Sequence, residues 1–93
     1  MANERFESVW DAISDTPEEA ENMKLRSSLM VTLKDYIDRE GLSQSQAAKV
    51  LGVTQPRVSD LVRGKIQLFG LDSLVNMVTA AGLRIEMTVA KAA

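Results

Sequence analysis

Residues 43–61 have the sequence SQSQAAKVLGVTQPRVSDL, which predicts two short helices joined by a tight turn. Ser43 and the glutamine three residues later have the spacing of a capping box, in which each side chain bonds a backbone N–H at the helix start. Gly52 is expected to end the first helix, because glycine adopts a positive φ without a steric penalty. Thr54 is a preferred residue for capping the second helix, and Pro56 lies in its first turn, where a missing N–H has little effect.

The second of these helices has a buried side and an exposed side. With about 100° of rotation per residue, Val58, Leu61 and Val62 face the interior, and Gly64 ends the motif. Small apolar residues at positions 47 and 48 of the first helix allow the second helix to cross close above it. The remaining side chains point outward, flank the outer face or lie at its N-terminal end: Gln55, Pro56, Arg57, Ser59, Asp60 and Arg63.

This outer face has the composition of a recognition helix that enters the major groove of DNA with its N-terminal end. Gln55 can bond the edge of adenine through two hydrogen bonds, and Arg57 can do the same to guanine. Pro56 offers an apolar surface to a thymine methyl group. Ser59 and Asp60 complete the predicted base-reading set. Asp60 either accepts a hydrogen bond from a cytosine amino group or only keeps the helix soluble, and we favour the second role.

Other polar residues lie at the ends of the two helices, where contacts with DNA phosphates fix the register without reading sequence. The predicted phosphate contacts are Ser43, Gln44, Thr54, Arg63 and Lys65. The alternative is a helical hairpin that packs within the protein and binds no DNA. We favour DNA binding, because both caps, the glycine turn, the inner residues and the exposed Gln-Pro-Arg coincide within one stretch.

Acidic and basic residues are divided unequally along the chain. The net charge of −2 combines residues 1–23, with seven acids and one arginine (−6), and residues 24–93, with ten bases and six acids (+4). This asymmetry predicts an acidic N-terminal arm, residues 1–22, followed by a basic body.

Three further helices are predicted outside the motif. Apolar residues within 6–13 have helical spacing. Thr16 begins a second segment with a capping pattern and a proline at the first helical position, and this helix should continue to residue 39 or 40, before Gly41. A third apolar helical face covers residues 71–81 and ends at Gly82.

Apolar and polar side chains alternate over residues 83–89, which is the period of a half-buried strand. An isolated strand leaves its backbone N–H and C=O groups unpaired. We therefore expect antiparallel pairing with the same strand of a second chain, and hence a two-fold homodimer; pairing with residues 2–9 of the same chain is the alternative. The residues predicted to form the dimer interface are Leu83, Ile85, Met87 and Val89.

Composition excludes most catalytic and metal chemistry. The chain has no histidine and no cysteine, so neither an imidazole base nor a thiolate or imidazole zinc ligand is available. We therefore expect no enzymatic activity, no cofactor and no metal. No segment has the roughly 18 consecutive apolar residues of a membrane span, and the N-terminus lacks the pattern of a secretion signal. We expect a cytoplasmic protein that does not associate with membranes.

Residues 41–65, GLSQSQAAKVLGVTQPRVSDLVRGK, closely resemble the helix-turn-helix of the Xre and phage-repressor class. The stretches FESVWDAISDTPEEAENMKLRSSLM before it and FGLDSLVNMVTAAGLRIEMTV after it are similar to HigA-type antitoxins and their free-standing relatives, so the resemblance covers residues 6–89. It implies that Gln55, Pro56, Arg57 and Asp60 lie along the groove and that Gln44 and Lys65 lie near phosphates. Pro56 departs from the polar reader of many relatives.

The resemblance also implies a homodimer that binds a palindromic double-stranded DNA operator and represses its own operon. A RelE/ParE-like ribonuclease toxin would be the protein partner. We expect the acidic arm to bind this basic toxin through Phe6 and Trp10, although Trp10 has the alternative role of covering the core. The rival function is a protein-interaction module that neutralises a toxin with little or no specific DNA binding.

The predicted fold is one domain, residues 1–93, and is mainly α: a lambda-repressor-like helix-turn-helix bundle of about five helices with one C-terminal β-strand used for dimerisation. Residues 23–82 form the bundle, with the motif at 43–64, and residues 83–89 form the strand. The predicted function is a sequence-specific DNA-binding repressor that is also an autoregulating antitoxin.

Overall fold

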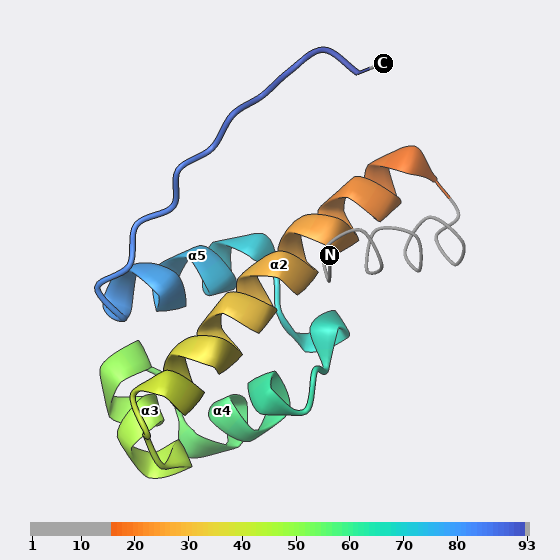
Figure 1. Cartoon of the computed structure of the whole chain (residues 1–93). Helices are drawn as coiled ribbons and strands as arrows, with labels where there is room; N and C mark the ends of the chain where they lie inside the picture. The colour runs from red at the N-terminus through yellow and green to blue at the C-terminus, as the bar shows by residue number, and fades with distance from the viewer. Residues whose placement is uncertain (1–15, 93) are drawn as a thin grey trace.

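The computed structural model describes residues 16–92, which contain four α-helices and one 3-10 helix (Figure 1). In chain order they are α2 (Pro17–Arg39), α3 (Gln44–Leu51), α4 (Gln55–Val62), the 3-10 helix η1 (Ile66–Leu68) and α5 (Leu71–Ala80). The helix predicted within residues 6–13 lies outside the described residues. None of the described helices is long and apolar enough to cross a membrane.

The long helix α2 begins and ends where its local signals predict. Thr16 Oγ1 accepts a hydrogen bond from the backbone N–H of Glu19 at 3.0 Å, and Pro17 lies in the first turn. The acidic side chains of Glu18 and Glu19 lie at the positive end of the helix dipole. Beyond the C-terminal end, Gly41 has a φ of 62°, the left-handed conformation that glycine adopts most readily.

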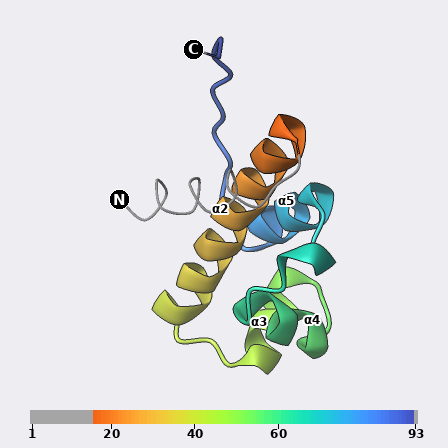
Figure 2. The same ribbon diagram turned by 90° about the vertical axis from the view of Figure 1, so that its right-hand side faces the viewer.

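One apolar core connects α2 to the other helices. α2 packs against α5, α4 and η1, and α3 packs against α4 and α5; Figure 2 shows α2 running along the bundle with α5 beside it. Leu33 on α2, Val58 on α4 and Leu74 on α5 are fully buried, and so is Phe69, directly after η1. Burial of each such side chain contributes about 1.5–3 kcal/mol. The core therefore fixes the position of α4 relative to the rest of the bundle.

The C-terminal segment, residues 83–92, corrects the prediction of a strand. It leaves α5 after Gly82 and runs away from the bundle without regular secondary structure (Figure 1). Its last backbone hydrogen bond to another described residue joins the Leu83 N–H to Val78 O at 3.1 Å. A strand requires backbone hydrogen bonds to a neighbouring strand, and residues 16–92 provide no such neighbour. Alternation shows which side chains share a face, but it does not supply the pairing partner.

The predicted architecture of about five helices with a C-terminal β-strand is therefore wrong. The described part of the chain has four α-helices, one 3-10 helix and no strand. The helix-turn-helix bundle itself fits the structure, with α3 and α4 at the predicted positions.

Candidate DNA interface

The α3–α4 pair contains the local hydrogen bonds that its sequence predicts. The Ser43 N–H donates to Gln46 Oε1 at 2.9 Å, and the Gln46 N–H donates to Ser43 Oγ at 3.1 Å, which confirms the capping box. Gly52 ends α3 with a φ of 69°. Thr54 Oγ1 accepts a hydrogen bond from the Arg57 N–H at 3.4 Å. These bonds fix the residue at which α4 begins, and with it the side chains of its first turn.

Small and medium-sized apolar side chains hold α3 and α4 together. Ala47 and Ala48 on α3 are buried, as are Val58 and Leu61 on α4. Because alanine side chains are short, the two helices approach closely, and a close-packed contact resists changes in the angle between them. The pair therefore presents the outer side of α4 as a fixed surface.

The N-terminal turn of α4 contains the most accessible of the predicted base-reading residues. Gln55 and Pro56 are exposed, whereas Arg57, Ser59 and Asp60 are half-buried. The predicted phosphate contacts are also largely accessible: Ser43, Gln44, Thr54 and Arg63 are exposed and Lys65 is half-buried. The structure thus leaves Gln55 and Pro56, in the first turn of α4, open to solvent, together with most of the predicted phosphate contacts.

Asp60 and Lys65 form an ion pair at the C-terminal end of α4. Lys65 Nζ lies 3.5 Å from Asp60 Oδ1, and the Lys65 N–H donates to Asp60 O at 3.1 Å. Sequence reasoning placed both residues at the interface but did not join them. Their charges cancel locally, so Arg63 is the predicted DNA-contacting residue that supplies unpaired positive charge at this end of α4.

Arg57 is the predicted base reader with the most extensive contacts inside the protein. Its Nη1 donates to Leu68 O at 2.6 Å, and its Nη2 donates to Ser73 Oγ at 3.2 Å. The guanidinium carbon also lies 4.1 Å from the centroid of the Phe69 ring, within the range of a cation–π interaction. The side chain therefore connects the first turn of α4 to η1 and to the start of α5.

Arg26 is a second arginine that contacts the same connection, and sequence reasoning missed it. From α2, its Nη1 donates to Ile66 O at 3.4 Å and to Phe69 O at 3.3 Å. Its Nη2 donates to Met23 Sδ at 3.0 Å. These backbone acceptors lie more than 39 residues along the chain, so no local spacing in the sequence could indicate the contact.

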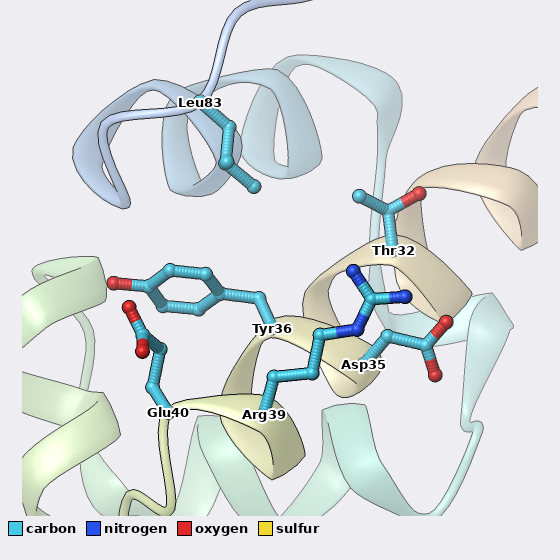
Figure 3. A pocket seen from close by; sticks show the side chains of 6 residues that line it. All are labelled: Thr32, Asp35, Tyr36, Arg39, Glu40 and Leu83. Carbon is cyan, nitrogen blue, oxygen red and sulfur yellow. The ribbon is translucent and has the colours of Figure 1, made fainter.

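The predicted dimer residues are the exposed apolar side chains of the C-terminal segment. Leu83, Ile85, Met87 and Val89 are 36%, 41%, 78% and 84% exposed. Leu83 points toward Tyr36 of α2 across a cavity of about 510 Å³ that Thr32, Asp35, Arg39 and Glu40 also line (Figure 3). The predicted toxin-docking residues, Phe6 and Trp10, lie outside the described residues.

No metal site accompanies these features in residues 16–92, where no group of three or more acidic side chains lies close enough to hold an ion.

Comparison with protein families matches residues 12–90 to a helix-turn-helix domain. A solved structure described as an XRE-family transcriptional regulator superposes with a TM-score of 0.73 at 34% sequence identity, covering 80% of this chain and 83% of that chain. Comparison with curated proteins gives no match. The resemblance to the Xre class is confirmed; the narrower resemblance to HigA-type antitoxins is not part of either match.

Proposed function

Because the chain belongs to the XRE family of helix-turn-helix DNA-binding transcriptional regulators, we propose that it is a sequence-specific repressor that binds a palindromic operator as a homodimer. The observation that carries this proposal is the exposed first turn of α4, fixed by the caps at Ser43 and Thr54. A rigid helix end with exposed polar side chains suits the reading of base edges in a major groove. The family also supports a non-enzymatic role.

Gln55 and Pro56 are the proposed centre of base reading, because both are exposed in the first turn of α4. The Gln55 amide carries a donor and an acceptor that match N7 and the amino group of adenine. Pro56 presents an apolar surface to a thymine methyl group. Ser59 and Asp60, one turn further along, reach the same groove, where Asp60 stays paired with Lys65 and adds no net charge.

Phosphate contacts are proposed at the helix ends. The hydroxyl oxygens of Ser43 and Thr54 accept the capping hydrogen bonds, and a hydroxyl group also has a proton to donate to a phosphate oxygen. Gln44 lies in the first turn of α3, where the backbone N–H groups and the helix dipole favour an anion. At the opposite end of α4, Arg63 supplies positive charge, whereas the positive charge of Lys65 is offset by Asp60.

A second copy of the chain is proposed to cover the apolar side chains of residues 83–89. Four apolar residues on one short segment are exposed here, and the cavity between Leu83 and Tyr36 offers a neighbouring space for side chains of a partner. A two-fold dimer would place its two α4 helices in successive major grooves if they lie about 34 Å apart. A palindromic operator follows from that symmetry.

The first experiment measures binding to duplex DNA from immediately upstream of the protein's own gene over a range of salt concentrations. The Gln55→Ala variant should lose about 1–3 kcal/mol of operator affinity and tolerate substitution of one A·T pair. Asn76→Ala is a matched control, because Asn76 is an exposed amide on α5, outside the motif. Equal binding of both variants and of unrelated DNA would reject sequence-specific reading.

An antitoxin role is proposed as a second function, supported by the charge of −6 on residues 1–23 and by the resemblance to HigA-type antitoxins. The acidic arm would bind a basic RelE/ParE-like toxin, with Phe6 and Trp10 in the contact. The test is co-purification with the product of a neighbouring toxin gene, using the full chain and a chain that lacks residues 1–22. Capture of the toxin by the shortened chain would contradict docking on the arm. Toxin capture without specific DNA binding would favour a protein-interaction module.

A further inference from the structure

The connection between α4 and α5 is held by two arginine side chains from different helices. Arg26 on α2 donates to the backbone oxygens of Ile66 and Phe69, and Arg57 on α4 donates to the backbone oxygen of Leu68. Charged donors form stronger hydrogen bonds with carbonyl oxygens than neutral donors do. Residues 66–69 therefore accept hydrogen bonds from two positively charged side chains, of which only Arg57 belongs to the helix-turn-helix motif.

The contacts of Arg57 use one N–H of each terminal nitrogen of its guanidinium group. Nη1 bonds Leu68 O and Nη2 bonds Ser73 Oγ, while the planar group stacks over the buried ring of Phe69. Reading guanine needs two parallel donors from the same guanidinium aimed at O6 and N7. In this conformation the terminal nitrogens are instead directed at the protein's own backbone and hydroxyl oxygens.

These contacts join the first turn of α4 to parts of the chain that lie 11 and 16 residues further along. Gln55 and Pro56 belong to the same turn as the Arg57 backbone. A displacement of Arg57 would therefore change the direction in which this turn projects, whereas Val58 and Leu61 would still hold the helix in the core.

We propose that Arg57 is a positioning residue of the DNA interface: it bonds Leu68 and Ser73 and stacks on Phe69, and so fixes the first turn of α4 for base reading by Gln55. This inference rests on the proposed function and assigns to Arg57 a role other than contact with guanine. Ser73 lies on α5, outside the motif, and helps to hold this turn by accepting a hydrogen bond from Arg57.

The Ser73→Ala variant distinguishes the two roles of Arg57. It removes one acceptor of Arg57 and leaves every residue of the motif unchanged. If Arg57 positions α4, Ser73→Ala should weaken operator binding several-fold, and Arg57→Ala should weaken it about tenfold, because a first turn that is no longer held must be ordered when DNA binds. The double variant should bind no more weakly than Arg57→Ala, because Ser73 acts on the first turn of α4 only through its hydrogen bond with Arg57. If Arg57 reads guanine, Ser73→Ala should leave binding unchanged or strengthen it.

The experiment uses the full-length chain and fluorescent duplexes from upstream of its own gene, with every base pair of the bound site substituted in turn. Positioning predicts that Arg57→Ala lowers affinity by a similar factor for every base pair of the half-site. It also predicts faster hydrogen exchange, in DNA-free protein, of the hydrogen-bonded amides of Arg57, Val58, Leu68 and Phe69. Loss of preference at a single G·C pair, with unchanged exchange and a neutral Ser73→Ala, would overturn the inference while the DNA-binding function stands. A wild-type protein without operator preference, together with a silent Gln55→Ala, would overturn the proposed function instead.

Discussion

Replacing Asp60 with asparagine should strengthen DNA binding and make it more sensitive to salt. Asp60 faces Lys65 across 3.5 Å at the end of α4, and the two side chains are 27% and 43% exposed. An ion pair with this exposure contributes about 0–1 kcal/mol to folding, so Asp60→Asn should change the unfolding free energy only slightly. The variant instead releases Lys65 for contact with a DNA phosphate.

The size of the effect follows from counterion release. One additional neutralised phosphate steepens the dependence of log affinity on log salt by about 0.9 per bound subunit, or about 1.8 for the homodimer. A fourfold rise in salt should therefore cost the dimeric variant about 12-fold more affinity than the wild type. Fluorescence anisotropy with a labelled operator duplex at several salt concentrations measures this slope.

A matched control is available at the far end of α2, where Glu21 forms an ion pair of 3.2 Å with Lys24. Glu21→Gln removes the same charge from a pair away from the motif, in which the carboxylate is more exposed (71% against 27% for Asp60), and should leave the slope unchanged. Equal slopes for wild type and Asp60→Asn would refute the reasoning about Lys65. Weaker operator binding by Asp60→Asn, with lost preference at one C·G pair, would show instead that Asp60 accepts a hydrogen bond from cytosine.

Three other substitutions test the fold and the proposed dimer. Ser43→Ala removes the capping hydroxyl of α3 and should cost about 1 kcal/mol, which lowers the melting temperature by about 4–8 °C in a domain of this size; an unchanged melting curve would contradict the capping argument. Phe69→Ala should reduce the unfolding free energy by about 3–5 kcal/mol in urea titrations, because the ring is fully buried, and a loss below about 1 kcal/mol would be inconsistent with its place in the core. Ile85→Lys should dissociate the homodimer in sedimentation experiments without unfolding the protein, whereas Val75→Lys, at a residue of similar exposure on α5 (40% against 41%), should leave the dimer intact. An unchanged sedimentation profile for Ile85→Lys would rule out the C-terminal segment as the dimer contact.

Sequence reasoning succeeded at the helix ends of the motif. Ser43 and Gln46 are three residues apart, and Thr54 accepts its hydrogen bond from the residue three positions later. Gly52 likewise takes the positive φ that its place between the helices requires. Each of these features depends on neighbouring residues alone, so the printed sequence contains all that is needed to predict it.

Sequence reasoning failed at the C-terminal segment for the opposite reason. The alternation from Leu83 to Val89 is real, but an unpaired segment cannot become a strand by its own pattern. Pairing depends on a backbone elsewhere in space, and residues 16–92 bring none to this segment.

The sequence by itself determined the helix-turn-helix, the boundaries of α3 and α4 and the exposure of Gln55 and Pro56 in the first turn of α4, because caps and helical periodicity act over three or four residues. Only the tertiary structure decided what Arg57 and Arg26 do. Their acceptors lie between 11 and 43 residues away along the chain, apart from the Met23 sulfur. These acceptors come within hydrogen-bonding distance only after Phe69 is buried against the packed helices, so the roles of both arginines arise from packing.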